Sequence, residues 1–115
     1  MLAHHAVVPT IWPAEVANGL LLGLRRGRLT SASLTQAATM LSQLPIEVSP
    51  QESATPIVRL VQCGREFSLT AYDPSYLSLA MVRGLPLATR DNALIGAARK
   101  AGVHLFDSGV GVGAA

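Results

Sequence analysis

The chain has 115 residues, of which 50% are hydrophobic and 14% are charged. This composition predicts one folded domain with a single core and excludes a disordered tail. Nine Lys and Arg residues against seven Asp and Glu residues give a formal net charge of +2. That balance excludes a protein that binds nucleic acid by its overall charge alone, so any contact with nucleic acid must be local.

The sequence contains no stretch that is typical of a membrane span or a secretion signal. Its most apolar stretch, residues 16–24, is interrupted by Asn18, Gly19 and Gly23 and is shorter than the roughly 18 residues that a span needs. The first residues lack a basic region before an apolar run, and the single cysteine, Cys63, cannot form an internal disulfide. We therefore expect a protein of the reducing cytoplasm.

The apolar pattern predicts nine elements in the order strand, two helices, strand, two helices, strand, helix, strand. The expected strands are residues 6–8, 46–48, 85–88 and 103–106. The expected helices are residues 13–26, a helix capped by Thr30 or Ser31 and ended by Pro45, and residues 49–66, 72–83 and 91–101. Residues 108–115 are rich in Gly and Ala and are expected to form a flexible tail. Strands joined by helices in this order predict a parallel sheet in an α/β sandwich.

Three acidic residues are expected at one edge of this sheet. A helix that follows or precedes a parallel strand begins at the edge where the strands end. Glu15 follows the strand 6–8, Asp73 begins the helix before the strand 85–88, and Asp91 follows that strand. Clustered carboxylates repel one another unless a cation lies among them, and their oxygens suit Mg²⁺ or Mn²⁺. The pattern indicates a phosphodiester-cleaving site, with helix capping and dipole complementation as the alternative for each acid.

Two stretches resemble a known family. Residues 69–94, LTAYDPSYLSLAMVRGLPLATRDNAL, resemble the C-terminal half of the PIN-domain ribonucleases, in particular the VapC-like toxins of type II toxin-antitoxin pairs. In that half, an acid in the pattern T-x-Y-D precedes a second acid in T-x-D. Residues 7–30, VVPTIWPAEVANGLLLGLRRGRLT, resemble the second strand of the same family and the helix with its acidic residue. Residues 97–106, AARKAGVHLF, resemble its last helix and strand.

The resemblance implies a fold, an activity and a set of site residues. The fold is a three-layer α/β/α PIN-like sandwich over residues 1–107, and the activity is Mg²⁺- or Mn²⁺-dependent hydrolysis of RNA phosphodiester bonds. The implied metal ligands are Glu15, Asp73 and Asp91. Thr89 is implied as a fourth catalytic residue whose hydroxyl orients the cluster. Arg90 is interpreted as a contact for a substrate phosphate, with a carboxylate pair or a solvated side chain as alternatives.

The same resemblance implies partners and an absent element. The partners are an RNA substrate, a cognate antitoxin protein and a second copy in a homodimer. PIN domains open with a central strand that ends in Asp, whereas this chain begins at what resembles the second strand, so it resembles an N-terminally truncated domain. We expect strands 6–8 and 85–88 either to pair directly or to receive a strand from another chain. We further expect weak or absent cleavage, and the alternative function is a non-enzymatic dimerisation or antitoxin-binding module.

Overall fold

The computed structural model describes residues 4–49, 56–69, 72–107 and 109–113. The chain divides into two compact units, one formed by Ile11–Pro45 and the other by Met1–Thr10 together with Ile46–Ala115. We describe each unit by itself and refer to them as the hairpin unit and the sheet unit.

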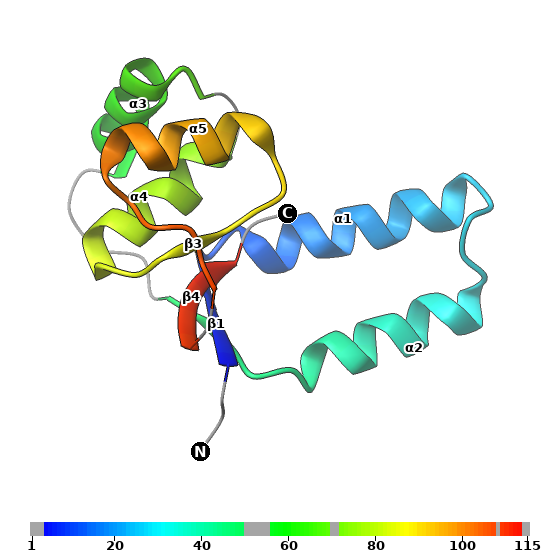
Figure 1. The fold of residues 1–115 in the computed structure, drawn as a ribbon. Helices are drawn as coiled ribbons and strands as arrows, with labels where there is room; N and C mark the ends of the chain where they lie inside the picture. Colours follow the sequence, from blue (N-terminus) through cyan, green and yellow to red (C-terminus); the bar gives the residue numbers. More distant parts are fainter. Residues whose placement is uncertain (1–3, 50–55, 70–71, 108, 114–115) are drawn as a thin grey trace. The chain divides into compact units, whose positions relative to one another are not determined.

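The sheet unit contains a four-stranded, all-parallel sheet in the order β2-β1-β4-β3 (Figure 1). Its strands are β1 (His4–Val8), β2 (Ile46–Val48), β3 (Leu87–Ala88) and β4 (Gly109–Gly113). Val7 on β1 lies beside Val112 on β4, which in turn lies beside Leu87 on β3, and all three side chains are fully buried. This row of apolar side chains forms the centre of the core. The predicted α/β class with a parallel sheet is confirmed.

Three helices complete the sheet unit: α3 (Pro56–Phe67), α4 (Asp73–Arg83) and α5 (Asn92–Ala101). They contact one another, and α4 also contacts β3 and β4. Gly84 and Gly102 end α4 and α5 with φ values of +63° and +74°, as their positions in the sequence predict. Leu77 of α4 and Leu94 of α5 are fully buried. In the ranges that the structure describes, no helix combines the length and hydropathy needed to cross a bilayer.

The hairpin unit consists of α1 (Trp12–Arg25) and α2 (Ser31–Ser42), which contact each other. In the connection between them, the backbone N–H groups of Arg28 and Leu29 both donate to the carbonyl oxygen of Gly23, at 2.9 and 3.2 Å. The predicted cap of the second helix is confirmed, because Thr30 and Ser33 form a capping box through reciprocal side-chain to backbone hydrogen bonds. The turn is therefore held by hydrogen bonds that are local in sequence.

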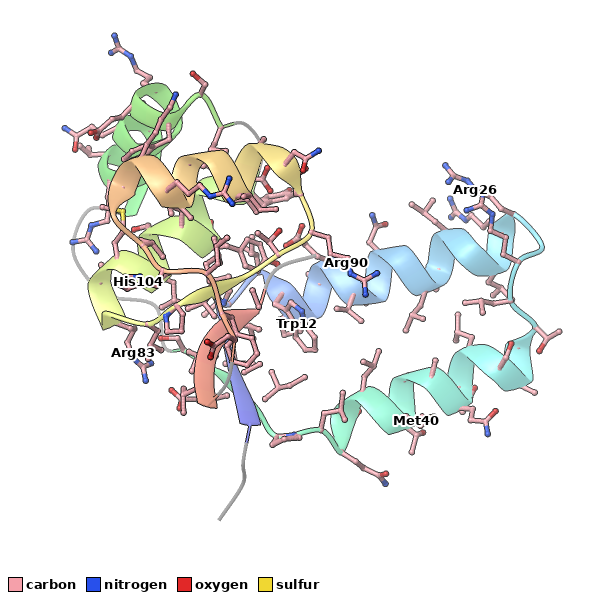
Figure 2. All side chains as sticks on the ribbon, viewed as in Figure 1. Trp12, Arg26, Met40, Arg83, Arg90 and His104 are labelled. Atoms are coloured by element: carbon pink, nitrogen blue, oxygen red, sulfur yellow. The ribbon has the colours of Figure 1, made fainter. Side chains whose placement is uncertain are left out.

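Neither helix of the hairpin unit contains a buried residue. Leu21, Met40 and Leu44 are each at least half exposed. Figure 2 shows Met40 on the side of α2 that faces away from α1, and Arg26 at the end of α1 beside the turn. The hairpin unit thus carries apolar side chains that its own two helices do not cover.

The C-terminal part of the sheet unit differs from the sequence-based expectation. Residues 103–106 were expected to form the last strand, but only Leu105 pairs there, through an isolated parallel bridge to Leu87. Residues 108–115 were expected to form a flexible tail, but Gly109–Gly113 form β4. The reason is that β4 pairs with a strand on each side and buries Val112, which offsets the entropic cost of ordering glycines. Residues 108, 114 and 115 lie outside the described residues.

The position of β4 also bears on the expected gap in the sheet. We expected the strand at 6–8 and the strand at 85–88 to pair directly, or to receive a strand from another chain. Instead, β4 of the same chain lies between them, with Gly111 beside Ala6 and Gly113 beside Ala88. Of the expected helix 49–66, the structure describes the part from Pro56 on as α3, and residues 50–55 lie outside the described residues.

Gly111 is the most tightly enclosed glycine of β4. A Cβ atom built on it would lie 2.6 Å from Cδ2 of Phe106 and 3.2 Å from the carbonyl oxygen of Pro86. The ring of Phe106 therefore covers the place where any other residue would carry a side chain. Glycine is required at position 111 because the ring of Phe106 and the backbone of Pro86 approach it so closely. The high glycine content of this segment, which suggested a flexible tail, therefore allows its strand to pack.

We predict that Gly111→Ala lowers the free energy of unfolding by about 1 to 3 kcal/mol, because the added methyl group overpacks the contact with Phe106. Gly96→Ala is the matched control, since Gly96 lies in α5 and its Cβ position has no heavy atom within 4 Å apart from its chain neighbours and the backbone of its own helix. This control should stabilise the protein by up to about 1 kcal/mol through helix propensity. Urea denaturation measures the free energy of unfolding of both variants. A Gly111→Ala variant as stable as the wild type would contradict the close packing at Gly111.

Candidate functional site

The carboxyl ends of the parallel strands form one edge of the sheet unit, and the residues after β3 lie at this edge. Thr89, Arg90 and Asp91 follow Ala88 directly and lead into α5. These are three of the residues that the sequence analysis assigned to the site. Their geometry is set by the short turn between strand and helix.

Asp91 is the N-cap residue of α5. Its Oδ2 atom accepts a hydrogen bond from the backbone N–H of Leu94 at 3.0 Å, and its own N–H donates to Oγ1 of Thr89, also at 3.0 Å. Leu94 is fully buried, so this bond connects the carboxylate to the core. The carboxylate is exposed yet fixed in position. Capping, the alternative role for this acid, is therefore observed, and it leaves the second carboxylate oxygen able to accept further bonds.

Asp73 lies in the first turn of α4 and precedes Pro74, which occupies a position where the missing N–H costs nothing. The N-cap residue is Tyr72, which makes no side-chain capping bond. The alternative that Asp73 is itself the N-cap thus differs from the structure. Asp73 is half-buried, and its charge complements the helix dipole at this end.

Asp73 and Asp91 lie toward the same edge of the sheet unit. The last residues of α4 connect through Gly84 to β3, so the first turn of α4 lies toward the end of β3 rather than its start. The first turn of α5 follows β3 directly. In Figure 1, α4 and α5 run in the same general direction. That the two carboxylates lie close enough to share one cation remains a prediction of the sequence analysis.

Glu15 lies in the first turn of α1 and is half-buried. It belongs to the hairpin unit, whereas the two aspartates belong to the sheet unit. That the carboxylate of Glu15 lies near those of the two aspartates stays a prediction. Within the described residues, no group of three or more His, Cys, Asp or Glu side chains has the arrangement of a metal site. The oxygen ligands that these residues would supply, three carboxylates and the hydroxyl of Thr89, are of the kind that Mg²⁺ and Mn²⁺ prefer.

Two arginines of the sheet unit have different environments. Arg90 is exposed at the edge that carries Thr89 and Asp91. Arg83 lies at the opposite end of α4, where its Nη1 atom donates to Oε2 of Glu47 at 3.1 Å and to Oγ of Ser49 at 3.4 Å. Sequence reasoning missed this link between α4 and β2, because the residues are 36 and 34 positions apart and no local pattern joins them. A contact between Arg90 and a substrate phosphate stays a prediction of the sequence analysis.

Cys63 is buried on α3, with its Sγ atom 3.9 Å from the carbonyl oxygen of Pro74. Burial raises the pKa of the Cys63 thiol above its ordinary value, and the negative charge of Glu66 raises it further. The side chain is thus a protonated thiol at neutral pH and not a nucleophile. This agrees with its interpretation as a small apolar residue.

Comparison with models of known protein families and with curated protein sequences gives no match for this chain. The candidate site therefore rests on the residues themselves and on their positions in the fold.

We predict that Asp91→Ala lowers the free energy of unfolding by about 1 kcal/mol, because the N–H of Leu94 loses its acceptor. Asp91→Asn should leave stability nearly unchanged, because the amide oxygen caps as well as a carboxylate. Chemical denaturation of both variants measures the difference. An Asp91→Ala variant as stable as the wild type would contradict the capping bond. If Asp91→Asn is as stable as the wild type, any change in its activity can be attributed to the lost negative charge.

We predict that an aromatic disulfide reagent modifies Cys63 more slowly in the folded protein than in urea, since burial limits access and the raised pKa lowers the thiolate fraction. Because Glu66 contributes to that shift, Glu66→Gln should lower the pKa and move the rate-against-pH profile toward lower pH. Glu47→Gln is the control, since Glu47 pairs with Arg83. Unchanged profiles in both variants would contradict the role of Glu66.

Proposed function

We propose that this protein is a Mg²⁺-dependent endoribonuclease of the VapC-like toxin type, a class of PIN-domain ribonuclease. The observation that carries the proposal is the position of two acids in the sheet unit. Asp91, from the T-x-D pattern, is fixed at the end of β3, and Asp73, from the T-x-Y-D pattern, begins the helix that leads into β3. An edge of a parallel sheet that carries two carboxylates supports phosphodiester chemistry.

Each residue of the proposed site has a distinct role. Asp73, Asp91 and Glu15 would hold the cation, Mg²⁺ or Mn²⁺. The bound cation would supply an activated water and neutralise charge that develops on the phosphate. Thr89 positions Asp91 by accepting its backbone N–H. Arg90 is exposed and lies between Thr89 and Asp91 in the sequence, and it would contact a neighbouring phosphate of the RNA.

The proposal includes a cellular context. An RNA-cleaving toxin acts in the cytoplasm on RNA and is restrained by a cognate antitoxin protein. A homodimer completes the assembly. These partners follow from the resemblance of residues 69–94 and 7–30 to the VapC-like toxins.

A second candidate is a non-enzymatic module that dimerises or binds an antitoxin. It is favoured by the hairpin unit, in which neither helix contains a buried residue and Leu21, Met40 and Leu44 are at least half exposed. A partner that covered these side chains would gain roughly 25 cal/mol for each Å² of apolar surface removed from water. Cleavage activity distinguishes the two candidates.

We predict that the purified chain cleaves RNA weakly in the presence of Mg²⁺ or Mn²⁺ and not at all in the presence of EDTA. Asp91→Asn should reduce the rate at least tenfold, because it removes a ligand charge while it retains the cap. Glu47→Gln is the matched control and should retain the rate, since Glu47 pairs with Arg83 at the far end of α4. Initial rates on a fluorescently labelled RNA measure all three.

The outcomes of this experiment separate the candidates. Cleavage that persists in EDTA would contradict metal dependence, and an undiminished rate in Asp91→Asn would contradict the role of Asp91. A chain that shows no metal-dependent cleavage at any concentration would overturn the enzymatic proposal and leave the binding module.

A further inference from the structure

Three arginines lie together at the turn of the hairpin unit. Arg25 is in the last turn of α1, Arg26 is its C-cap residue, and Arg28 lies in the connection to α2. All three residues are exposed, and Arg26 is drawn beside the turn in Figure 2. Among the residues that the structure describes, none of the three guanidinium groups has an ion-pair or side-chain hydrogen-bond partner. We refer to these three residues as the arginine cluster.

The hairpin unit holds little negative charge that could offset the arginine cluster. Its residues 11–45 include one acid, Glu15, and α2 has no charged residue. Glu15 lies ten residues before Arg25 on α1, which places the two about 15 Å apart along the helix axis. Exposed charges at that distance are largely screened at physiological salt. The cluster therefore presents three positive charges at one end of the unit.

The end of α1 does not require these side chains for its own stability. Its last carbonyl oxygens, those of Leu22, Gly23 and Leu24, accept backbone N–H groups from residues 26–29. The start of α2 adjoins the same turn, and the positive end of its dipole offsets the negative end of the α1 dipole. Capping and dipole complementation, the ordinary roles of basic residues at a helix end, therefore leave the cluster unexplained.

The backbone that carries the arginine cluster has a defined geometry. Gly27, within the turn, has a φ of +71°, which favours glycine. The capping box between Thr30 and Ser33 fixes the start of α2 two residues after Arg28. The three arginines are thus held near one another before any ligand binds, which lowers the entropic cost of binding one.

We propose that the arginine cluster binds the sugar-phosphate backbone of RNA. Each guanidinium group can donate two parallel hydrogen bonds to a phosphate, a geometry that the ammonium group of lysine lacks. An RNA strand repeats this acceptor along its length, so three neighbouring arginines can contact several phosphates of one strand. The apolar residues of the turn, Leu24 and Leu29, are partly buried, which disfavours insertion into a lipid bilayer. The choice of RNA among polyanions rests on the proposed function.

The cluster acts on binding of the RNA strand and not on the chemical step. If Glu15 holds the cation, the cluster lies about 15 Å along α1 from that carboxylate and contacts phosphates remote from the scissile bond. Its loss should therefore raise the KM for a long RNA and leave kcat unchanged. An RNA of about three nucleotides is too short to reach both places, so its KM should not depend on the cluster.

Binding measured in EDTA tests the cluster apart from cleavage. The probe is a fluorescein-labelled oligouridine of about 20 nucleotides, and its anisotropy gives Kd from about 50 to 200 mM salt. Arg25→Gln, Arg26→Gln and Arg28→Gln together should weaken binding at least tenfold at the lowest salt. They should also flatten the slope of log K against log salt by about 2, since each phosphate contact on a single strand contributes about 0.7. The corresponding three lysine substitutions should keep the slope, because they keep the charge.

Removal of three positive charges elsewhere is the matched control. Arg65→Gln, Arg99→Gln and Lys100→Gln remove the same charge from exposed positions on α3 and α5. This variant should bind within about threefold of the wild type and keep its salt slope. Equal losses in both triple variants would show that net charge alone governs binding, and an unchanged Kd in the glutamine variant of the cluster would exclude the contact. Either result overturns the proposal.

Two further probes test the choice of RNA. Vesicles of phosphatidylcholine and phosphatidylserine that bind through the cluster, in a chain that does not bind the oligouridine, would overturn it in favour of a membrane surface. Polyglutamate that competes as well as RNA at equal charge would overturn it in favour of an acidic protein. We expect neither.

Failure of this inference differs from failure of the proposed function. A chain that binds the oligouridine through the cluster but shows no metal-dependent cleavage would overturn the nuclease and support the RNA contact. A chain that cleaves a long RNA with the same KM after the three glutamine substitutions would overturn the contact and support the nuclease.

Discussion

The pairing of β4 with strands on both of its sides is the constraint on which the sheet unit depends. β1 and β2 pair with each other, and among the described strands β4 is the one that joins β3 to them. The side chains of Val7, Val112 and Leu87 are adjacent and buried because β4 lies between β1 and β3, and α4 packs against β3 and β4. Each buried backbone group left unpaired would cost about 1 to 3 kcal/mol, which is a large share of the 5 to 15 kcal/mol typical of small domains.

The elements that could be predicted from sequence are those whose signals are local. The helix ends at Gly84 and Gly102 need a left-handed residue, and the helix start at Thr30 needs a side-chain acceptor, so one residue type at one position decides each. β4 was not predictable in this way. Its glycines indicate a loop when they are considered alone, and the partners that make it a strand, β1 and β3, are distant in sequence. Strand pairing is a non-local property, which a local pattern does not contain.

The candidate site also combines features that are local in sequence with features that depend on packing between distant segments. The position of Asp91 follows from its place between a strand and a helix, and the structure adds the acceptor role of Thr89 and the bond to Leu94. Asp73 could be placed at the start of its helix, although the N-cap position, which was the alternative role for this acid, is occupied by Tyr72. The convergence of Glu15 depends on how a separate unit packs, and no periodicity in the sequence encodes that. A short sequence motif can therefore predict the local turn that holds Asp91, but it does not predict whether three acids from distant segments come together.

The alternation of glycine and valine in β4 leaves its alignment weakly specified. Moving the strand by two residues places Val110 where Val112 lies and sets another glycine under the ring of Phe106, so the pattern of large and small residues repeats. Only the ends of the strand distinguish the two alignments. The repeating pattern therefore permits a second alignment of similar packing, and slow exchange between the two alignments would double the amide resonances of β1 and β3 while leaving those of the hairpin unit single.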